Sequence, residues 1–358
     1  MLFLINFAGK AGTEKYVEQL ARIFTRRGER CFFAYNIPGE LSEKMAAMGI
    51  ECLRVDMSSA HAPKAAKTLA AFCRERKIDV IHAQYPVENV IALLARRRCP
   101  GLRVVYTGHL TVDGGAKWRL VNRLFTPGNH AVIAVCNAGR DALIGNGVCP
   151  ERITVISNGV EPEPEPVRDY SARAALGIGD DEFMISCFAR CSPEKGVLFL
   201  IDAMARLRAL TDRPFRCVIC GDGELFDEAG AKIAELGLGE RVLMAGYRTD
   251  GADILRASDI YVNSSSSEAM SFALLEAMNA ALPLVVTDLP GNRELALDDA
   301  FPCGLLAAYG DTDGYAQAVL RLMTDSALYD EYAANAPARI RRDFDIEKLA
   351  EKVLETYQ

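Results

Sequence analysis

The chain holds 358 residues, of which 50% are hydrophobic and 25% are charged, and its formal net charge is −7. A chain of this length and composition can fold into two globular domains of ordinary size. The acidic balance argues against general electrostatic binding to nucleic acid. The sequence has no run of 18 apolar residues and begins without a basic signal-peptide region, so we expect a cytoplasmic protein.

Short, continuously apolar runs alternate with amphipathic stretches through residues 1–160. Such runs, separated by helical patterns, are typical of parallel strands that helices cover on both faces. We therefore predict an N-terminal Rossmann-like domain over residues 1–160. Its predicted strands are 2–5, 31–35, 51–55, 80–82, 104–106, 131–135 and 153–156, and its helical patterns include 14–26, 63–76 and 90–97.

Residues 161–166 read Glu-Pro-Glu-Pro-Glu-Pro, which we interpret as a linker because proline lacks a backbone donor and constrains its predecessor. The alternation then restarts, and it predicts a second Rossmann-like domain over 167–335. Its strands are expected at 183–188, 215–220, 242–245, 259–262 and 284–287. Within residues 336–358, a closing helix at about 346–356 is predicted to cross back onto the first domain.

The expected fold class is therefore α/β, with two doubly wound parallel sheets facing a cleft. In open α/β sheets, ligands bind at the carboxyl ends of the strands. Eleven cysteines in a chain without a secretion signal are expected to be reduced. Four of them, at 187, 191, 217 and 220, have a spacing that suggests zinc, but they lie in or beside strand-like runs where successive side chains diverge. We therefore predict no metal site.

The most informative stretch runs from 264 to 278 and sets Glu268 and Glu276 eight positions apart around a predicted helix start. A helix start stabilises a diphosphate, because its first amides lack intrahelical partners and the helix dipole is positive there. Carboxylates beside such a site suit the hydroxyls of a sugar or a ribose. The plainer interpretation is an ordinary helix cap, since serine-rich loops followed by glutamate are common capping signals.

Two more loops follow strands of the second domain. Arg190 and Lys195 lie on a loop that leads into a helix near residue 197, where two cations can clamp the phosphates of a nucleoside diphosphate. Gly221 and Gly223 follow the strand at 215–220 and would admit a nucleotide backbone. The alternatives are surface cations and a tight turn.

The first domain offers a glycine-bearing loop and a histidine. Residues 9–14 connect the first strand to a helix, and Gly12 permits close approach of backbone to a ligand. His109 follows the strand at 104–106, where it could bind a sugar hydroxyl or position an acceptor. His82, also at a strand end, is its nearest rival, and either residue can instead be a structural histidine.

With these residues assembled, the sequence resembles the retaining GT-B glycosyltransferases of family four, the glycosyl transferases group 1. The resemblance covers nearly the whole chain, and the matching motifs occur in the same order as in the family. They are the loop at 9–14, residues 79–82, His109, residues 157–160, Arg190 with Lys195 and Gly196, residues 221–223, and the spaced pair Glu268 and Glu276.

The resemblance implies a role for each matching residue. Arg190 and Lys195 would bind the donor diphosphate, Glu268 the donor sugar and Glu276 the ribose. The backbone near Met270, Ser271 and Phe272 would meet the phosphate or sugar. Gly12 would approach the phosphate from the first domain, and His109 would lie near the transferred sugar. The resemblance implies neither a cofactor nor an obligatory metal.

The function expected from this resemblance is retaining transfer of a hexose from a nucleotide-diphosphate sugar to a hydroxyl acceptor, such as a glycolipid or a cell-envelope glycan. A nucleotide-sugar epimerase and a non-catalytic nucleotide-sugar-binding protein remain as alternatives. Ala269 and Ser271 stand where relatives often carry glycine. The identity of the donor sugar therefore stays open.

Basic and aromatic residues gather before residue 130, with Arg96, Arg97 and Arg98 closing one predicted helix and Lys117, Trp118 and Arg119 opening another. Such a surface suits peripheral contact with anionic lipid at the inner face of a membrane. The alternative is a solvated helix face.

Overall fold

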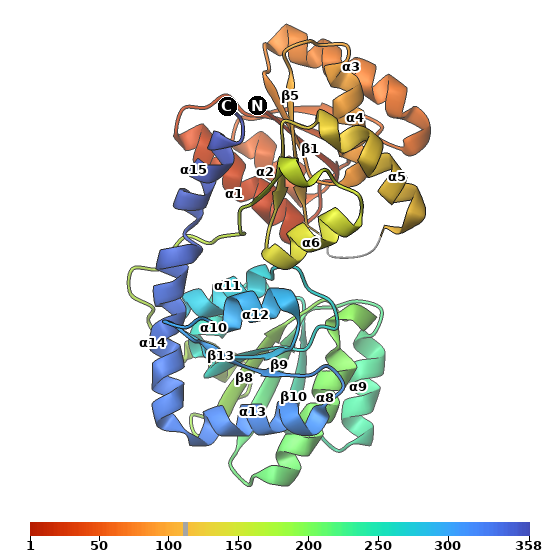
Figure 1. Ribbon diagram of the computed structural model, residues 1–358. Coiled ribbons are helices and arrows are strands. Elements are labelled where there is room, and N and C mark those ends of the chain that lie inside the picture. The colour runs from red at the N-terminus through yellow and green to blue at the C-terminus, as the bar shows by residue number, and fades with distance from the viewer. Residues whose placement is uncertain (110–113) are drawn as a thin grey trace. The chain divides into compact units, whose positions relative to one another are not determined.

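The computed structural model describes residues 1–109 and 114–358, and these form two compact units (Figure 1). The first unit comprises Met1–Asn158 together with Ile346–Gln358, and the second comprises Gly159–Asp345. The proline-rich stretch at 161–166 thus belongs to the second unit. Helix α14 (Ser326–Asp343) runs across position 335, where the sequence placed a boundary, and stays in the second unit.

The first unit is built on a seven-stranded parallel sheet with the order β3-β2-β1-β4-β5-β6-β7. The continuous apolar runs predicted all seven strands. They are β1 (Leu2–Phe7), β2 (Phe32–Ile37), β3 (Glu51–Arg54), β4 (Val80–Ala83), β5 (Arg103–Gly108), β6 (Ala131–Ala134) and β7 (Ile153–Val155).

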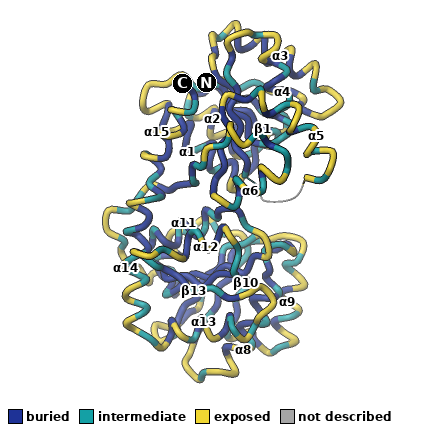
Figure 2. Tube along the Cα trace, in the orientation of Figure 1, coloured by how far each residue is buried: buried dark blue, intermediate teal, exposed yellow. Residues whose placement is uncertain are grey.

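Helices accompany this sheet, and all of them except α5 bury apolar residues on one face. They are α1 (Gly12–Arg26), α2 (Glu40–Ala47), α3 (Ala62–Arg76), α4 (Pro86–Arg96), α5 (Gly115–Phe125) and α6 (Asn137–Gly145). Figure 2 shows the central strands in the colour of buried residues, whereas α5 is drawn largely as exposed.

Helix α15 (Ile346–Glu355) completes the first unit from the far end of the chain. Its buried face consists of Ile346, Leu349, Ala350 and Val353. Arg27, which directly follows α1, pairs with Glu347 at 2.9 Å and with Glu351 at 3.2 Å. Two residues beyond the helix, the hydroxyl of Tyr357 lies 2.6 Å from Nδ1 of the buried His82.

The second unit contains a six-stranded parallel sheet with the order β10-β9-β8-β11-β12-β13. Its strands are β8 (Phe183–Phe188), β9 (Phe215–Cys220), β10 (Val242–Gly246), β11 (Ile260–Asn263), β12 (Leu284–Thr287) and β13 (Gly304–Ala307). The sequence did not predict β13. This edge strand reads Gly-Leu-Leu-Ala, with neither β-branched nor aromatic residues to mark it.

The helices of the second unit connect these strands and close the unit. They are α7 (Ser171–Ala175), α8 (Val197–Leu210), α9 (Phe226–Glu235), α10 (Gly251–Ala257), α11 (Phe272–Asn279), α12 (Pro290–Ala296), α13 (Thr312–Thr324) and α14.

The eleven cysteines are all free thiols. Cys187, Cys191 and Cys217 belong to one hydrophobic cluster of the second unit, and Cys220 belongs to another. Within residues 1–109 and 114–358, no group of three or more metal-ligating side chains comes together. Across the same residues, no helix is both long and apolar enough to cross a membrane.

Candidate functional site

The polar loops of the second unit follow four strands that are neighbours in its sheet, β9, β8, β11 and β12. Because these strands are parallel, their carboxyl ends meet at one edge, where ligands bind in open α/β sheets. The sequence-predicted residues at this edge are Arg190 and Lys195 after β8, Gly221 and Gly223 after β9, and Glu268 after β11, with Glu276 on α11.

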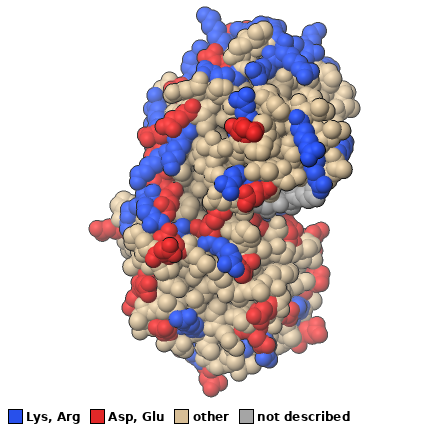
Figure 3. All heavy atoms as spheres, viewed as in Figure 1, with Lys and Arg blue, Asp and Glu red and all other residues tan. Residues whose placement is uncertain are grey.

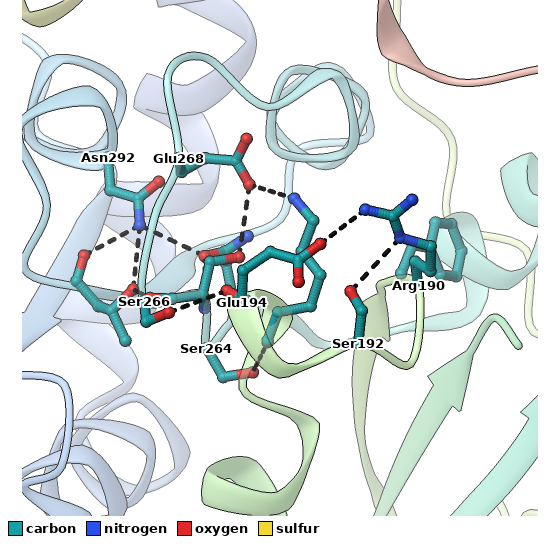
Figure 4. Close-up of polar contacts among 12 residues, drawn as sticks. Arg190, Ser192, Glu194, Ser264, Ser266, Glu268 and Asn292 are labelled. Carbon is teal, nitrogen blue, oxygen red and sulfur yellow. Dashed lines mark hydrogen bonds and ion pairs between the residues drawn. The ribbon is translucent and has the colours of Figure 1, made fainter. Parts of the chain in front are cut away.

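Lys195 and Glu268 are joined directly at this edge, and Figure 4 shows Glu268 beside the loop that carries Arg190, Ser192 and Glu194. The Lys195 ammonium donates to Oε2 of Glu268 at 2.7 Å, and the two side chains are 26% and 12% exposed. The backbones of the two loops are also joined, because Ser264 Oγ donates to the Lys195 carbonyl at 3.0 Å and the Ser266 amide donates to the Glu194 carbonyl at 2.8 Å. A cation and a carboxylate 73 residues apart are thereby held together at the strand ends.

Arg190 lies on the same loop and is 69% exposed. Its guanidinium donates to Oε1 of Glu194 at 2.6 Å and to Ser192 Oγ at 3.4 Å. A hydrogen bond with Ser192, and then the bond with Arg190, help lower the pKa of Glu194 to about 2. The loop after β8 therefore presents two cations, each already in contact with a carboxylate.

Gly221 and Gly223 have φ of +144° and +146°, values that side chains rarely adopt. A Cβ at Gly221 would lie 2.0 Å from the Ala189 carbonyl oxygen, and one at Gly223 would lie 2.6 Å from that of Cys191. These glycines allow the loops after β8 and β9 to pack together. The structure thus gives them a packing role beside the donor-binding role that the resemblance implies.

Helix α11 begins at Phe272, so Glu268 precedes its first turn and Glu276 lies in its second. Ser271 occupies the N-cap position in an extended conformation, but its side chain makes no capping hydrogen bond. Glu268 pairs with Lys195 instead of serving as an ordinary cap, and this pairing favours the site interpretation. Met270 and Phe272 are buried, whereas Glu276 is half-buried.

His109 and Gly12 belong to the first unit. His109 directly follows β5, where its Nε2 lies 2.9 Å from Oε1 of Gln84 and its ring packs edge-on against Tyr16 at 5.1 Å. Burial lowers the pKa of His109 to about 3. His109 as a whole is half-buried, and the lowered pKa favours the neutral imidazole at pH 7. Gly12 is the first residue of α1, the helix that carries Tyr16.

His82, the rival of His109, is a structural residue. It is fully buried, its Nδ1 bonds Tyr357, and its Nε2 lies 2.6 Å from Thr107 Oγ1. Burial lowers the pKa of His82 to about 3, so it also stays neutral. Both ring nitrogens are thus occupied inside the protein.

Two residues of these contacts, Glu194 and Gln84, were not predicted from the sequence. Glu194 lies in the loop after β8, between the predicted Arg190 and Lys195. Its contact with Arg190 depends on the loop conformation, which the sequence does not reveal. Gln84 comes directly after β4, the position that marked the other candidates. A polar residue at the end of a strand was therefore the signal that could have identified Gln84.

Comparison with known proteins identifies the family of the chain. Residues 11–164 match the family model Glycosyltransferase Family 4, and residues 170–339 match the model Glycosyl transferases group 1. The chain is 26% identical over 332 residues to the UDP-Gal:alpha-D-GlcNAc-diphosphoundecaprenol alpha-1,3-galactosyltransferase of Escherichia coli, covering 88% of this chain and 84% of that protein.

Two further proteins also match over most of the chain. The chain is 29% identical over 294 residues to the lipopolysaccharide core biosynthesis mannosyltransferase LpsB of Rhizobium meliloti, covering 79% of this chain and 80% of that protein. Its fold matches HepE of Anabaena, solved in complex with UDP and glucose, with a TM-score of 0.83 at 23% identity over 99% and 98% of the two chains. The chain therefore belongs to the group 1 glycosyltransferases and has the GT-B fold.

Proposed function

We propose that this glycosyltransferase moves a hexose, with retention at the anomeric carbon, from a nucleotide-diphosphate sugar to a hydroxyl of a glycolipid or cell-envelope glycan. The contact between Lys195 and Glu268 carries the donor half of the proposal. It joins a cation suited to phosphate with a carboxylate suited to sugar hydroxyls at the carboxyl ends of neighbouring strands. The printed names of the Escherichia coli and Rhizobium relatives support the acceptor class.

In the proposed reaction, Arg190 and Lys195 neutralise the diphosphate as it leaves. Its oxygens compete with Glu194 and Glu268 for the two cations, and Glu268 then turns to the donor sugar. The positive end of α11, near residues 270–272, adds to this stabilisation, so the proposal needs no metal. Glu276 binds the ribose hydroxyls, and the loops at Gly221 and Gly223 border the nucleotide.

Retention follows when attack and departure occur on the same face of the sugar. The bond between the anomeric carbon and the phosphate oxygen breaks, and a bond from the acceptor oxygen forms on that face. The acceptor proton passes to the leaving phosphate. His109 and Gly12, in the first unit, are assigned to the transferred sugar and to the donor phosphate.

A labelled-donor assay tests the proposal. A thermal-shift screen of nucleotide sugars first identifies the donor, because a bound ligand stabilises the fold according to its concentration and Kd. The labelled donor is then incubated with lipid-linked glycan acceptors, and we expect a glycosidic product whose anomeric configuration matches the donor. An epimerised sugar without glycosidic product would support the epimerase alternative, and binding without turnover would support a non-catalytic protein. An inverted product would contradict retention.

We further propose that the enzyme contacts anionic membranes through α5. Leu120 and Leu124 of this helix are 60% and 68% exposed. At 100° per residue, Arg119 and Arg123 flank the two leucines on one side and Lys117 on the other. Helix α5 has no acidic residue, and the guanidinium carbon of Arg97, which directly follows α4, lies 5.9 Å from the centre of the Phe125 ring. Lys and Arg side chains gather on the first unit, to which α5 belongs (Figure 3). This positive charge supports docking on anionic lipid.

Vesicle sedimentation should detect this contact. We expect the protein to pellet with phosphatidylglycerol vesicles and to remain in the supernatant with phosphatidylcholine or at high salt. Changing both Leu120 and Leu124 to serine should lower partitioning at least about tenfold, because each leucine buried in the interface contributes roughly 1.5–3 kcal/mol. The matched control changes Leu210 and Leu297, both 42% exposed in the second unit, and should bind as before. Equal recovery with both lipids would contradict the contact.

A further inference from the structure

A buried glutamine determines which nitrogen of His109 carries the proton. Gln84 is fully buried, and its Nε2 donates to the backbone carbonyl of His82 at 3.2 Å. This bond fixes the orientation of the amide, so that its oxygen faces Nε2 of His109 at 2.9 Å. Because an amide oxygen only accepts hydrogen bonds, Nε2 of His109 must be the donor.

The surroundings of His109 favour its neutral form. Among residues 1–109 and 114–358, the ionisable side chains recorded beside the ring are Tyr16, Tyr85 and His82. Burial raises the pKa of both tyrosines and lowers that of His82 to about 3, so all three are uncharged at pH 7. A neutral imidazole carries a single proton. With that proton on Nε2, Nδ1 holds a lone pair and can only accept.

We propose that Gln84 is a positioning residue that locks His109 in the Nε2–H tautomer, so that His109 receives a hydrogen bond from a sugar hydroxyl through Nδ1. This inference rests on the proposed function for its sugar, but the tautomer itself does not. A sugar position that carries a hydroxyl satisfies the lone pair, whereas a fluorine at that position cannot donate. His109 thereby selects for a hydroxyl at one position of the transferred sugar.

Nitrogen NMR of the ligand-free protein tests the tautomer directly. The chain has only four histidines, so each ring can be assigned with single His→Gln variants after 15N-histidine labelling. We expect His109 to show a protonated Nε2 and an unprotonated Nδ1 at pH 7. In Gln84→Met the lock is removed, and the two tautomers should mix. The control is Gln19→Met, which removes a buried glutamine of α1 and should leave the His109 signals unchanged. An Nδ1–H tautomer in the wild type, or unchanged signals in Gln84→Met, would overturn the proposal.

Kinetics test the sugar contact. With a series of monofluoro donors, kcat/KM of the wild type should fall about fivefold or more at one ring position, since an unpaired buried acceptor costs roughly 1–3 kcal/mol. Gln84→Met should lose part of this discrimination against fluorine. If every fluoro donor reacts like its parent while the NMR signals behave as expected, the tautomer stands and the Nδ1 contact is wrong. If no glycosyl transfer is found at all, the proposed function fails and the NMR result is unaffected.

Discussion

Changing Lys195 to alanine is expected to lower kcat of sugar transfer roughly a hundred- to a thousandfold, the usual effect of removing one preorganised group that stabilises developing charge. The donor KM should change less, because Arg190 and α11 still attract the diphosphate. Steady-state assays with labelled donor measure both constants. The variant should stay folded, since Lys195 is a partly exposed side chain at a loop.

Lys232→Ala is the matched control for this variant. Lys232 pairs with Asp202 at 2.6 Å and is 27% exposed, close to the 26% of Lys195. Both changes remove one lysine from an ion pair in the same unit, but Lys232 lies on α9, away from the strand-end loops. A Lys195→Ala enzyme as active as Lys232→Ala would show that Lys195 does not act on the leaving group.

Gly196→Ala should disable the enzyme without touching a charged group. Gly196 has φ of +63°, and a Cβ there would lie 2.0 Å from the Ser264 carbonyl oxygen. The loops that carry Lys195 and Glu268 could then no longer keep their present approach. Because a misplacement of about 1 Å can cost roughly a hundredfold in rate, we expect kcat/KM to fall by at least that factor. A lower Tm should accompany the loss.

Gly237→Ala separates crowding from backbone strain. Gly237 has the same φ of +63°, but the nearest atom to its added Cβ is a guanidinium nitrogen of Arg208 at 3.8 Å. This variant should lose only about 1–2 kcal/mol of stability from the left-handed conformation and keep its activity. Similar activity losses in both glycine variants would refute the argument from loop contact.

The sequence predicted the strands well because most are buried on both faces and read as continuous apolar runs. β13 was not predicted because this edge strand consists of glycine, leucine and alanine, a pattern that does not distinguish a strand from a helix or a loop. The boundary at 335 was drawn from the alternation of apolar runs alone. That alternation could not reveal that α14 continues through Pro337 to Asp343.

The candidate site was predictable as a set of positions and not as a set of contacts. A polar residue after a buried strand points to the ligand edge of the sheet, and this rule found Arg190, Lys195 and His109. Which carboxylate each cation meets depends on the path of the loops in space. The tautomer of His109 is harder still to predict, because it depends on the orientation of the Gln84 side-chain amide.

Helix α15 has a consequence for the synthesis of the chain. Residues 346–358 are translated after the whole second unit, yet they supply a helix of the first unit and a partner for the buried His82. Residues 1–158 therefore leave the ribosome well before α15 is available to pack against α1. The unit that is synthesised first is therefore completed last. The second unit can fold while the first still lacks its C-terminal helix.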